Sequence, residues 1–425
     1  MSEEGGTARG YRRRIALPQS FAPFRHRPYA RLWTGAFVSN IGTWMETVAI
    51  GVYVTEVTRQ AAWTGTVAAA GFVPVAVLAP VGGALADRLP RRVLLIATSL
   101  VQTALAALLT LLFVAGEPSA PVVTLIVFGG GIASALGFPA YQAMLPDLVP
   151  AEDVPGAMAL SSAQWNLGRV VGPALAGVVV EVGGFSWALG LNALSFLAVV
   201  AVLLPMRLPA PAPTHGESLR SSMLAGIRHV RADPGLRVSV GAMSLNTLLA
   251  APFIALVPAM AEKVFDSGAR GTAILVTAQG IGAVAMGLAL GGLTQRLGAR
   301  RVVVAMLTLL PPALVLYGYA PALALSAIAL LVVGALYLGA LSSFFTISQL
   351  RAPQHLRGRV LAVNNVILGS LYPLGSVMQG RIADSIGLRA TTAGAGIVMA
   401  GSLLLVRIAR PGLTRAIEEE PAIAG

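Results

Sequence analysis

The sequence is 425 residues long, with 56% hydrophobic residues, 11% charged residues and a formal net charge of +12. Soluble domains carry about 25% charged residues, so the outer surface of this chain is suited to lipid rather than water. The chain has no cysteine, which excludes disulfides and a thiol nucleophile. In such an apolar chain the positive charge indicates orientation in a membrane, and we expect no nucleic-acid partner.

Residues 1–32 are polar and rich in arginine, and they contain no apolar stretch that would mark a cleavable signal. We expect a cytoplasmic basic arm here. After it the chain alternates between long apolar stretches and short polar connections. A helix of about 20 apolar residues crosses the hydrocarbon core of a bilayer, and only helices satisfy their own backbone in lipid when no barrel is formed. We therefore expect an all-α membrane protein of twelve transmembrane helices, at 33–55, 63–85, 93–115, 121–145, 155–180, 187–205, 238–261, 271–293, 302–320, 322–348, 359–382 and 390–409.

The arginines are concentrated in the N-terminal arm, the even-numbered connections and the tail 410–425. Because positive residues remain on the cytoplasmic side, both termini are predicted to be cytoplasmic. The expected location is the plasma (inner) membrane, as a multi-pass and monomeric protein with the lipid bilayer as its surroundings.

The longest connection, 206–237, separates six predicted helices (33–205) from six more (238–409). It begins with several prolines, typical of an extended linker. In Ser218–Arg231, apolar residues recur at helical spacing with arginines opposite, which predicts an amphipathic helix on the cytoplasmic membrane surface. The alternative is a merely solvated linker.

The two predicted halves share a sequence repeat. Gly83–Arg92 (GALADRLPRR) follows the second predicted helix, and Gly291–Arg300 (GGLTQRLGAR) follows the eighth. Internal repeats are typical of transporters that bind substrate between the two repeats. Gly83–Arg92 also resembles the signature loop of the major facilitator superfamily, with Pro90 where that family usually has glycine. The resemblance implies two parallel six-helix halves.

A narrower resemblance extends over most of the chain. Ser39–Met45, Pro139–Pro146, Val171–Ala174 and Gly226–Arg231 are similar to the enterobactin-exporter-like, or transmembrane secretion effector, subfamily. The resemblance implies efflux of siderophores or drugs. In the fifth predicted helix, a motif that resembles the exporter signature of the superfamily is formed by Gly168, Gly172, Pro173 and Gly177.

The signature loop supplies candidate gating residues, namely Asp87, Arg88, Arg91 and Arg92. The resemblance implies that Asp87 caps a helix end and pairs with an arginine, which latches the outward-facing state. The alternative is an ordinary surface ion pair, which contributes about 0–1 kcal/mol. In the second half Gln295 replaces the acid before Arg296, so we expect a weaker latch there.

Glu46 and Arg169 are ionisable residues deep within predicted helices, where charges are costly and usually functional. Glu46 is the only carboxylate near the middle of a predicted span, which makes it the candidate site for a coupling proton. Arg169 could pair with Glu46 or attract an anionic substrate, and a purely structural pair is the alternative. Many proton antiporters of the superfamily have a functional arginine in the fourth helix, and this sequence has none there.

The remaining polar and aromatic groups in the predicted spans are candidates for lining a substrate cavity: Asn40, Trp44, Gln142, Gln164, Trp165, Asn166, Asn246, Gln279, Asn364, Asn365 and Tyr372. No nucleotide-binding loop, metalloprotease motif or catalytic triad is present, so we expect neither an enzyme nor a bound cofactor or metal. The sequence predicts a secondary active transporter that exports a small amphipathic molecule in exchange for protons. A nutrient importer on the same fold and a non-transporting membrane scaffold are the alternatives.

Overall fold

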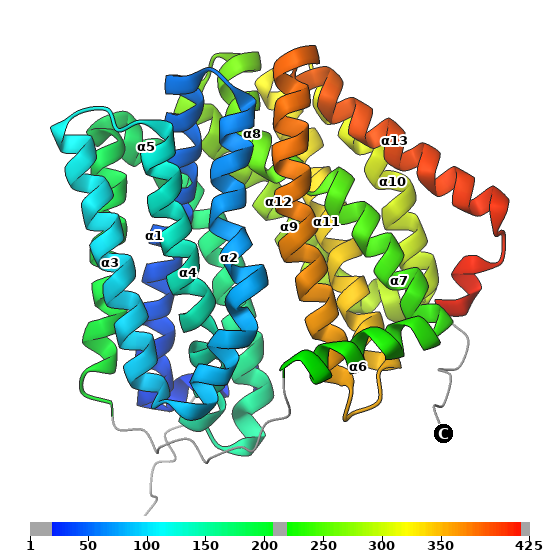
Figure 1. Cartoon of the computed structure of the whole chain (residues 1–425), viewed down its shortest axis with the longest axis horizontal. Helices are drawn as coiled ribbons and strands as arrows, with labels where there is room; N and C mark the ends of the chain where they lie inside the picture. Colours follow the sequence, from blue (N-terminus) through cyan, green and yellow to red (C-terminus); the bar gives the residue numbers. More distant parts are fainter. Residues whose placement is uncertain (1–18, 207–218, 418–425) are drawn as a thin grey trace, which may run out of the picture.

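The computed structural model describes residues 19–206 and 219–417, and within these ranges every regular element is helical (Figure 1). Most of the expected basic arm, the proline-rich start of the linker and the end of the tail lie outside the described residues. Four short helical turns complete the described part: η1 (Gln19–Arg25), η2 (Pro146–Leu148), η3 (Ala151–Asp153) and η5 (Leu413–Ile417).

Five long helices pack together into a first bundle. Their ends follow from local chemistry: Pro28 lies in the first turn of the first helix, where its missing N–H costs nothing, and Pro90 stops the second. The fifth helix contains a break at Gly184, whose φ of 78° is readily adopted only by glycine. The helices are α1 (Arg27–Thr58), α2 (Ala61–Arg88), α3 (Arg91–Ala115), α4 (Ala120–Met144) and α5 (Val154–Leu203).

A second bundle contains the helices after the linker. Its first helix, α7 (Pro234–Leu245), runs directly into a π-helical turn, η4 (Asn246–Ala250). The next helix, α8 (Phe253–Phe265), begins just after Pro252. π-Helical turns widen a helix locally and are frequent at functional sites. The other members are α9 (Gly268–Leu297), α10 (Ala299–Tyr319), α11 (Leu323–Arg351), α12 (Arg357–Ile386) and α13 (Leu388–Ala409).

The linker helix α6 (Leu219–Ala232) occupies the segment where the sequence predicts an amphipathic helix. It lies against α12, and a Cβ on Gly226 would come within 2.5 Å of the Arg359 carbonyl oxygen. Asp233, just after α6, accepts a hydrogen bond from the Leu236 amide and so caps α7. The same carboxylate pairs with Arg351 at 2.8 and 2.9 Å, and both side chains are buried. This ion pair joins the linker to the end of α11.

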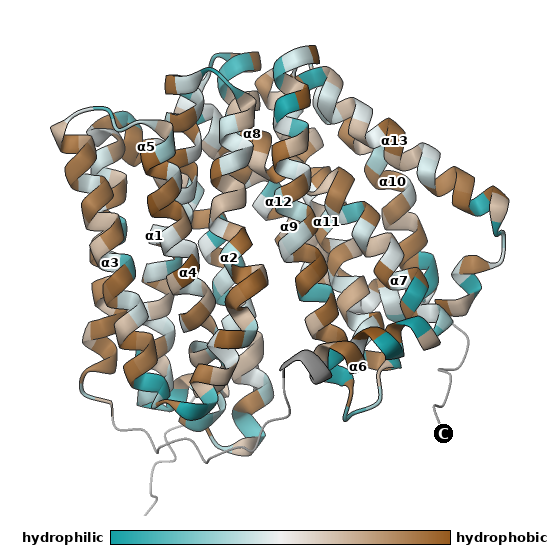
Figure 2. Cartoon of the chain, viewed as in Figure 1, coloured by the Kyte–Doolittle hydropathy of each residue, from teal (hydrophilic) through white to brown (hydrophobic). Residues whose placement is uncertain are grey.

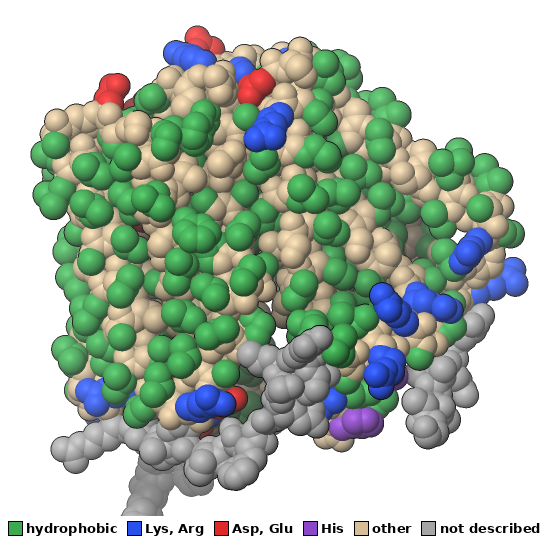
Figure 3. All heavy atoms as spheres, viewed as in Figure 1, with side chains coloured by type: hydrophobic (Ala, Val, Ile, Leu, Met, Phe, Trp, Pro, Cys, Tyr) green, Lys and Arg blue, Asp and Glu red, His purple; other side chains and the backbone are tan. Residues whose placement is uncertain are grey.

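Ten segments of the described chain are long and apolar enough to cross a membrane, by length and composition. One of them, Ala151–Leu203, contains the break at Gly184 and is 53 residues long. The helices consist mainly of hydrophobic residues (Figure 2), and on the face shown in Figure 3 hydrophobic side chains cover the middle of the molecule while most basic side chains lie toward its ends. Leu111, Val182 and Leu288 are 66%, 85% and 83% exposed. An apolar outer surface of this extent fits lipid rather than water.

The two bundles meet mainly through α2 against α12 and α5 against α9. In Figure 1 their ribbons lie together at the top and separate toward the bottom, where α6 lies. We call the end with α6 the linker end and the other the closed end. Close approach of the helices depends on glycine: a Cβ on Gly65 of α2 would come within 2.3 Å of the Ser376 carbonyl oxygen of α12.

Within the first bundle, α2 and α4 approach each other at Gly82. A Cβ there would lie 2.3 Å from the Ala135 carbonyl oxygen, whereas nothing lies within 4 Å of a Cβ on the adjacent Gly83. Gly82→Val is therefore expected to destabilise the bundle by about 1–3 kcal/mol through overpacking. Gly83→Val is the matched control, because it makes the same glycine-to-valine change, with the same effect on helix propensity, at the adjacent position of α2. Thermal unfolding in detergent should show a lower Tm for the first variant alone, and equal Tm values would contradict this packing.

Candidate functional site

Arg169 lies where the two bundles meet, and its side chain is only 9% exposed. Its guanidinium lies over the Trp44 ring of α1, with 5.6 Å between Cζ and the ring centroid. Tyr337 of α11 and Tyr372 of α12 are close enough to interact with it electrostatically. Among the described residues it forms no ion pair, and Nε has no hydrogen-bond partner. Arg169 is thus a buried cation that lies against an aromatic ring of the first bundle and interacts electrostatically with two tyrosines of the second.

Glu46 does not pair with Arg169 in this structure. Its carboxylate Oε2 accepts a hydrogen bond from Nδ2 of Asn192, which is buried in the part of α5 after the break. Ser195 donates to the Oδ1 of the same Asn192 at 3.1 Å. The result is a short polar chain between α1 and α5 inside the first bundle. The structural Glu46–Arg169 pair considered from the sequence is therefore not formed.

Aromatic residues extend from Arg169 across the first bundle. Trp165 lies edge-on to Trp44 at 5.7 Å, and Phe138 of α4 lies 6.4 Å from Trp165. Trp165 and Phe138 are 43% and 51% exposed. In the second bundle Tyr372 contacts Phe72 of α2 at 4.9 Å. Stacking surfaces of this kind suit an amphipathic molecule with flat rings.

The glycines of the predicted exporter motif make two different contacts. Gly168 and Gly172 pack α5 against α1, where their Cβ atoms would meet Asn40 and Trp44 at 3.0 and 2.6 Å. Gly177 packs against the other bundle, where its Cβ would lie 2.6 Å from that of Ala273 in α9. Pro173, between them, is buried within the helix. The motif thus positions Trp44 and also brings the two bundles together.

At the closed end, ionic contacts join the bundles. Asp384 at the end of α12 accepts hydrogen bonds from the Ala61 and Ala62 amides at 2.7 and 2.9 Å, and so caps α2 from the other bundle. Lys263 donates to the same carboxylate at 3.3 Å, and Arg59, which follows α1, pairs with Glu262 of α8 at 3.0 Å. Sequence reasoning did not single out Asp384 because its partners at the start of α2 are 322 and 323 positions away.

The gating residues lie at the linker end. Asp87 and Arg88 are exposed and form no hydrogen bond or ion pair with any described residue. Arg91 pairs with Asp147 at 2.6 Å, and Arg92 donates to the Leu203 carbonyl oxygen at 2.8 Å, so both contacts stay within the first bundle. In the second bundle Gln295 and Arg296 are also exposed. The latch implied for Asp87 is not closed in this conformation.

The predicted cavity residues with polar side chains fall into three sets: bonded, buried without a partner, and partly exposed. Gln164 accepts from Tyr141 and donates to the Trp33 carbonyl oxygen, both at 2.8 Å, and Asn364 donates to Ser348 at 2.8 Å, so both tie neighbouring helices together. The amides of Asn246 and Gln279 are buried with neither polar atom bonded. Trp44 Nε1 and Gln142 Oε1 are likewise buried without a partner. Asn40, Asn166 and Asn365 are at least partly exposed, and Asn166 donates to the Ser162 carbonyl oxygen.

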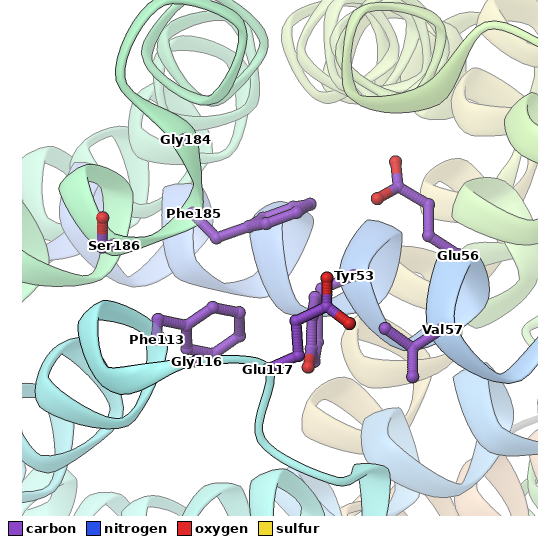
Figure 4. A pocket seen from close by; sticks show the side chains of 9 residues that line it. All are labelled: Tyr53, Glu56, Val57, Phe113, Gly116, Glu117, Gly184, Phe185 and Ser186. Atoms are coloured by element: carbon purple, nitrogen blue, oxygen red, sulfur yellow. The ribbon is translucent and has the colours of Figure 1, made fainter.

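A cavity of about 430 Å³ opens at the closed end of the first bundle (Figure 4). The rings of Tyr53, Phe113 and Phe185 contact one another there, and the Glu56 and Glu117 carboxylates lie at its edge. Sequence reasoning missed this pocket because its residues come from α1, the end of α3, the α3–α4 connection and the break in α5. All of its lining belongs to the first bundle, whereas transporters bind substrate between two repeats. The Arg169 region is therefore the better candidate site.

Solved transporter structures share this fold. The chain superimposes on a POT family transporter in complex with 5-aminolevulinic acid with a TM-score of 0.75 at 13% identity, covering 94% of this chain and 99% of that one. It also matches the nucleoside transporter NupG with a TM-score of 0.67 at 14% identity, covering 92% and 99%. At such low identity the likeness establishes the fold alone.

The chain belongs to the transmembrane secretion effector family, whose model matches residues 18–422. It is 27% identical over 383 residues to the multidrug efflux pump Tap of Mycolicibacterium fortuitum, covering 86% of this chain and 91% of that protein. It is 27% identical over 408 residues to the enterobactin exporter EntS of Escherichia coli, covering 90% and 92%. The macrolide efflux protein A of Streptococcus pyogenes is 25% identical, covering 84% and 89%. The predicted family is confirmed, and the chain is a multi-pass membrane transporter rather than an enzyme.

Proposed function

We propose that this transporter exports a small amphipathic molecule by alternating access, driven by exchange for protons. The observation that supports this most is the one-sided bonding between the bundles. Asp384 and Glu262 tie them together at the closed end, whereas Arg91 and Arg92 at the linker end bond only within the first bundle. If the linker end is cytoplasmic, as the arginines predict, this conformation accepts substrate from the cytoplasm.

The proposal includes the expected topology. Counting α1 as a span and the broken α5 as two adds two to the ten apolar segments and gives twelve. Both termini are then cytoplasmic, and α6 lies at the cytoplasmic surface of the inner membrane. The protein acts as a monomer, because the contact between its own two bundles supplies the alternating interface.

Efflux relatives also support the direction of transport. Tap, EntS and macrolide efflux protein A are all named as efflux proteins, and each aligns with this chain over most of its length. Glu46 is the proposed proton site, because its carboxylate is held by one amide and can gain or lose a proton without breaking a salt bridge.

Uptake into inverted vesicles tests the proposal. A panel of dyes, antibiotics and siderophores is offered to energised inverted vesicles, with and without a proton uncoupler, and vesicles lacking the protein are the control. We expect uncoupler-sensitive accumulation of at least one compound. Accumulation only in right-side-out vesicles would favour the importer, and no movement in either orientation would favour a scaffold.

A further inference from the structure

The buried charge of Arg169 raises the question of what neutralises it. A guanidinium carries five N–H donors and stays charged under all physiological conditions. Removing such a charge from water is costly unless it is paired. Among the described residues, the one carboxylate predicted near mid-span, Glu46, is bonded to Asn192 instead. Arg169 therefore lacks the counter-ion that a structural role would require.

The groups around Arg169 cannot serve as that counter-ion. Trp44 faces it with the ring, and the nearby polar groups of Tyr337 and Tyr372 are phenols. Aromatic faces stabilise a cation by about 0.5–2 kcal/mol but leave its N–H donors unsatisfied.

A second buried donor lies beside the first. The indole Nε1 of Trp44 is a donor only, and it too is buried without a partner. An anionic group that accepts from both side chains would satisfy these donors and neutralise the charge of Arg169. The exposed rings of Trp165 and Phe138 continue from Trp44 and offer a flat apolar surface next to that charge.

We propose that the central site recognises an aromatic anion, with the anionic group at Arg169 and Trp44 Nε1 and the ring against Trp165. The inference rests on the proposed function, since it names the substrate class of that transporter. Arg169 and Trp44 belong to the first bundle while Tyr337 and Tyr372 belong to the second. An anion bound at Arg169 therefore lies where the two bundles meet, as alternating access requires.

Calorimetric titration of the purified full-length protein in lipid nanodiscs tests the inference with three probes of one shape. They are 2-naphthoate, which is anionic, 2-naphthamide, which is neutral, and 2-naphthylmethylammonium, which is cationic. We expect naphthoate to bind at least about tenfold more tightly than the other two after subtraction of empty nanodiscs, the factor that one charge-assisted contact supplies. Arg169→Gln should remove the preference, and Arg169→Lys should keep part of it.

Arg270→Gln is the control, because Arg270 is an exposed arginine on α9. Equal binding of the three probes to the unsubstituted protein would overturn the inference, as would no binding of naphthoate at all, and neither result depends on the variants folding. A preference retained in Arg169→Gln would overturn it too. Binding is measured without a gradient, so a protein that prefers naphthoate yet moves no compound in vesicles would refute the proposed function and leave this inference standing.

Discussion

Glu46→Gln is expected to abolish accumulation driven by a pH gradient while the protein remains folded. Glutamine has the shape of glutamate and can still bond to the Asn192 side chain, but it cannot take up and release a proton. If one proton exchanges for one substrate molecule and no membrane potential is present, each pH unit of gradient drives about tenfold accumulation, because tenfold corresponds to ~1.4 kcal/mol. In vesicles with the variant, the ratio of the compound's inside to outside concentration should stay at about one. The measurement uses inverted vesicles and any compound that the unsubstituted protein transports.

Glu56→Gln is the matched control for this experiment. Glu56 lies ten positions further along α1, near the closed end and beside the pocket of Figure 4. Its substitution by glutamine should leave accumulation unchanged. Exchange of labelled for unlabelled substrate without a gradient should persist in Glu46→Gln, since its binding site is intact. Accumulation by Glu46→Gln at the unsubstituted level would rule out Glu46 as the coupling site.

Asp384→Asn is expected to open the closed end. The carboxylate accepts from two amides at the start of α2 and pairs with Lys263, and a hydrogen bond to a charged group contributes about 1.5–3 kcal/mol. Because Asp384 is partly exposed, we expect the lower end of that range, or about a tenfold shift in population. A cysteine at Ser376, which is fully buried below this contact, should react with a maleimide about ten times faster.

Because the natural sequence contains no cysteine, the maleimide labels only the cysteine introduced by Ser376→Cys. Two further substitutions serve as controls for this labelling. Glu181→Gln removes an exposed carboxylate that forms no bond with any described residue and should change nothing. Asp87→Asn weakens the implied latch at the linker end and should leave labelling at or below the unsubstituted rate. Unchanged labelling in Asp384→Asn would show that this carboxylate does not hold the bundles together.

Helix positions could be predicted because lipid imposes simple rules. The boundary predicted between the spans 302–320 and 322–348 falls in the short connection between the end of α10 at Tyr319 and the start of α11 at Leu323. The helix predicted at 218–231 coincides with α6. In both cases a local pattern, either a proline turn between apolar runs or an amphipathic face, determines the local structure.

The residues that tie the molecule together could not be predicted in the same way. Asp384 was not singled out at all, and Arg351 counted only as one positive charge on the predicted cytoplasmic side. Their partners, Ala61 and Asp233, are 323 and 118 positions away. A sequence states which charges exist and near which span end they lie, but pairing depends on which helices become neighbours.

The sequence by itself determined that this chain is an α-helical membrane transporter, since its low charge, long apolar stretches and signature loop are local properties. Only the tertiary structure decided the partners of its two deep charges. Trp44 and Glu46 are two positions apart on α1, so they point about 200° apart around the helix axis at 3.6 residues per turn. Trp44 therefore faces Arg169 while Glu46 faces Asn192. Which face of a helix meets which neighbour is set by packing of the whole bundle, and that packing separates the proposed proton site from the proposed anion site.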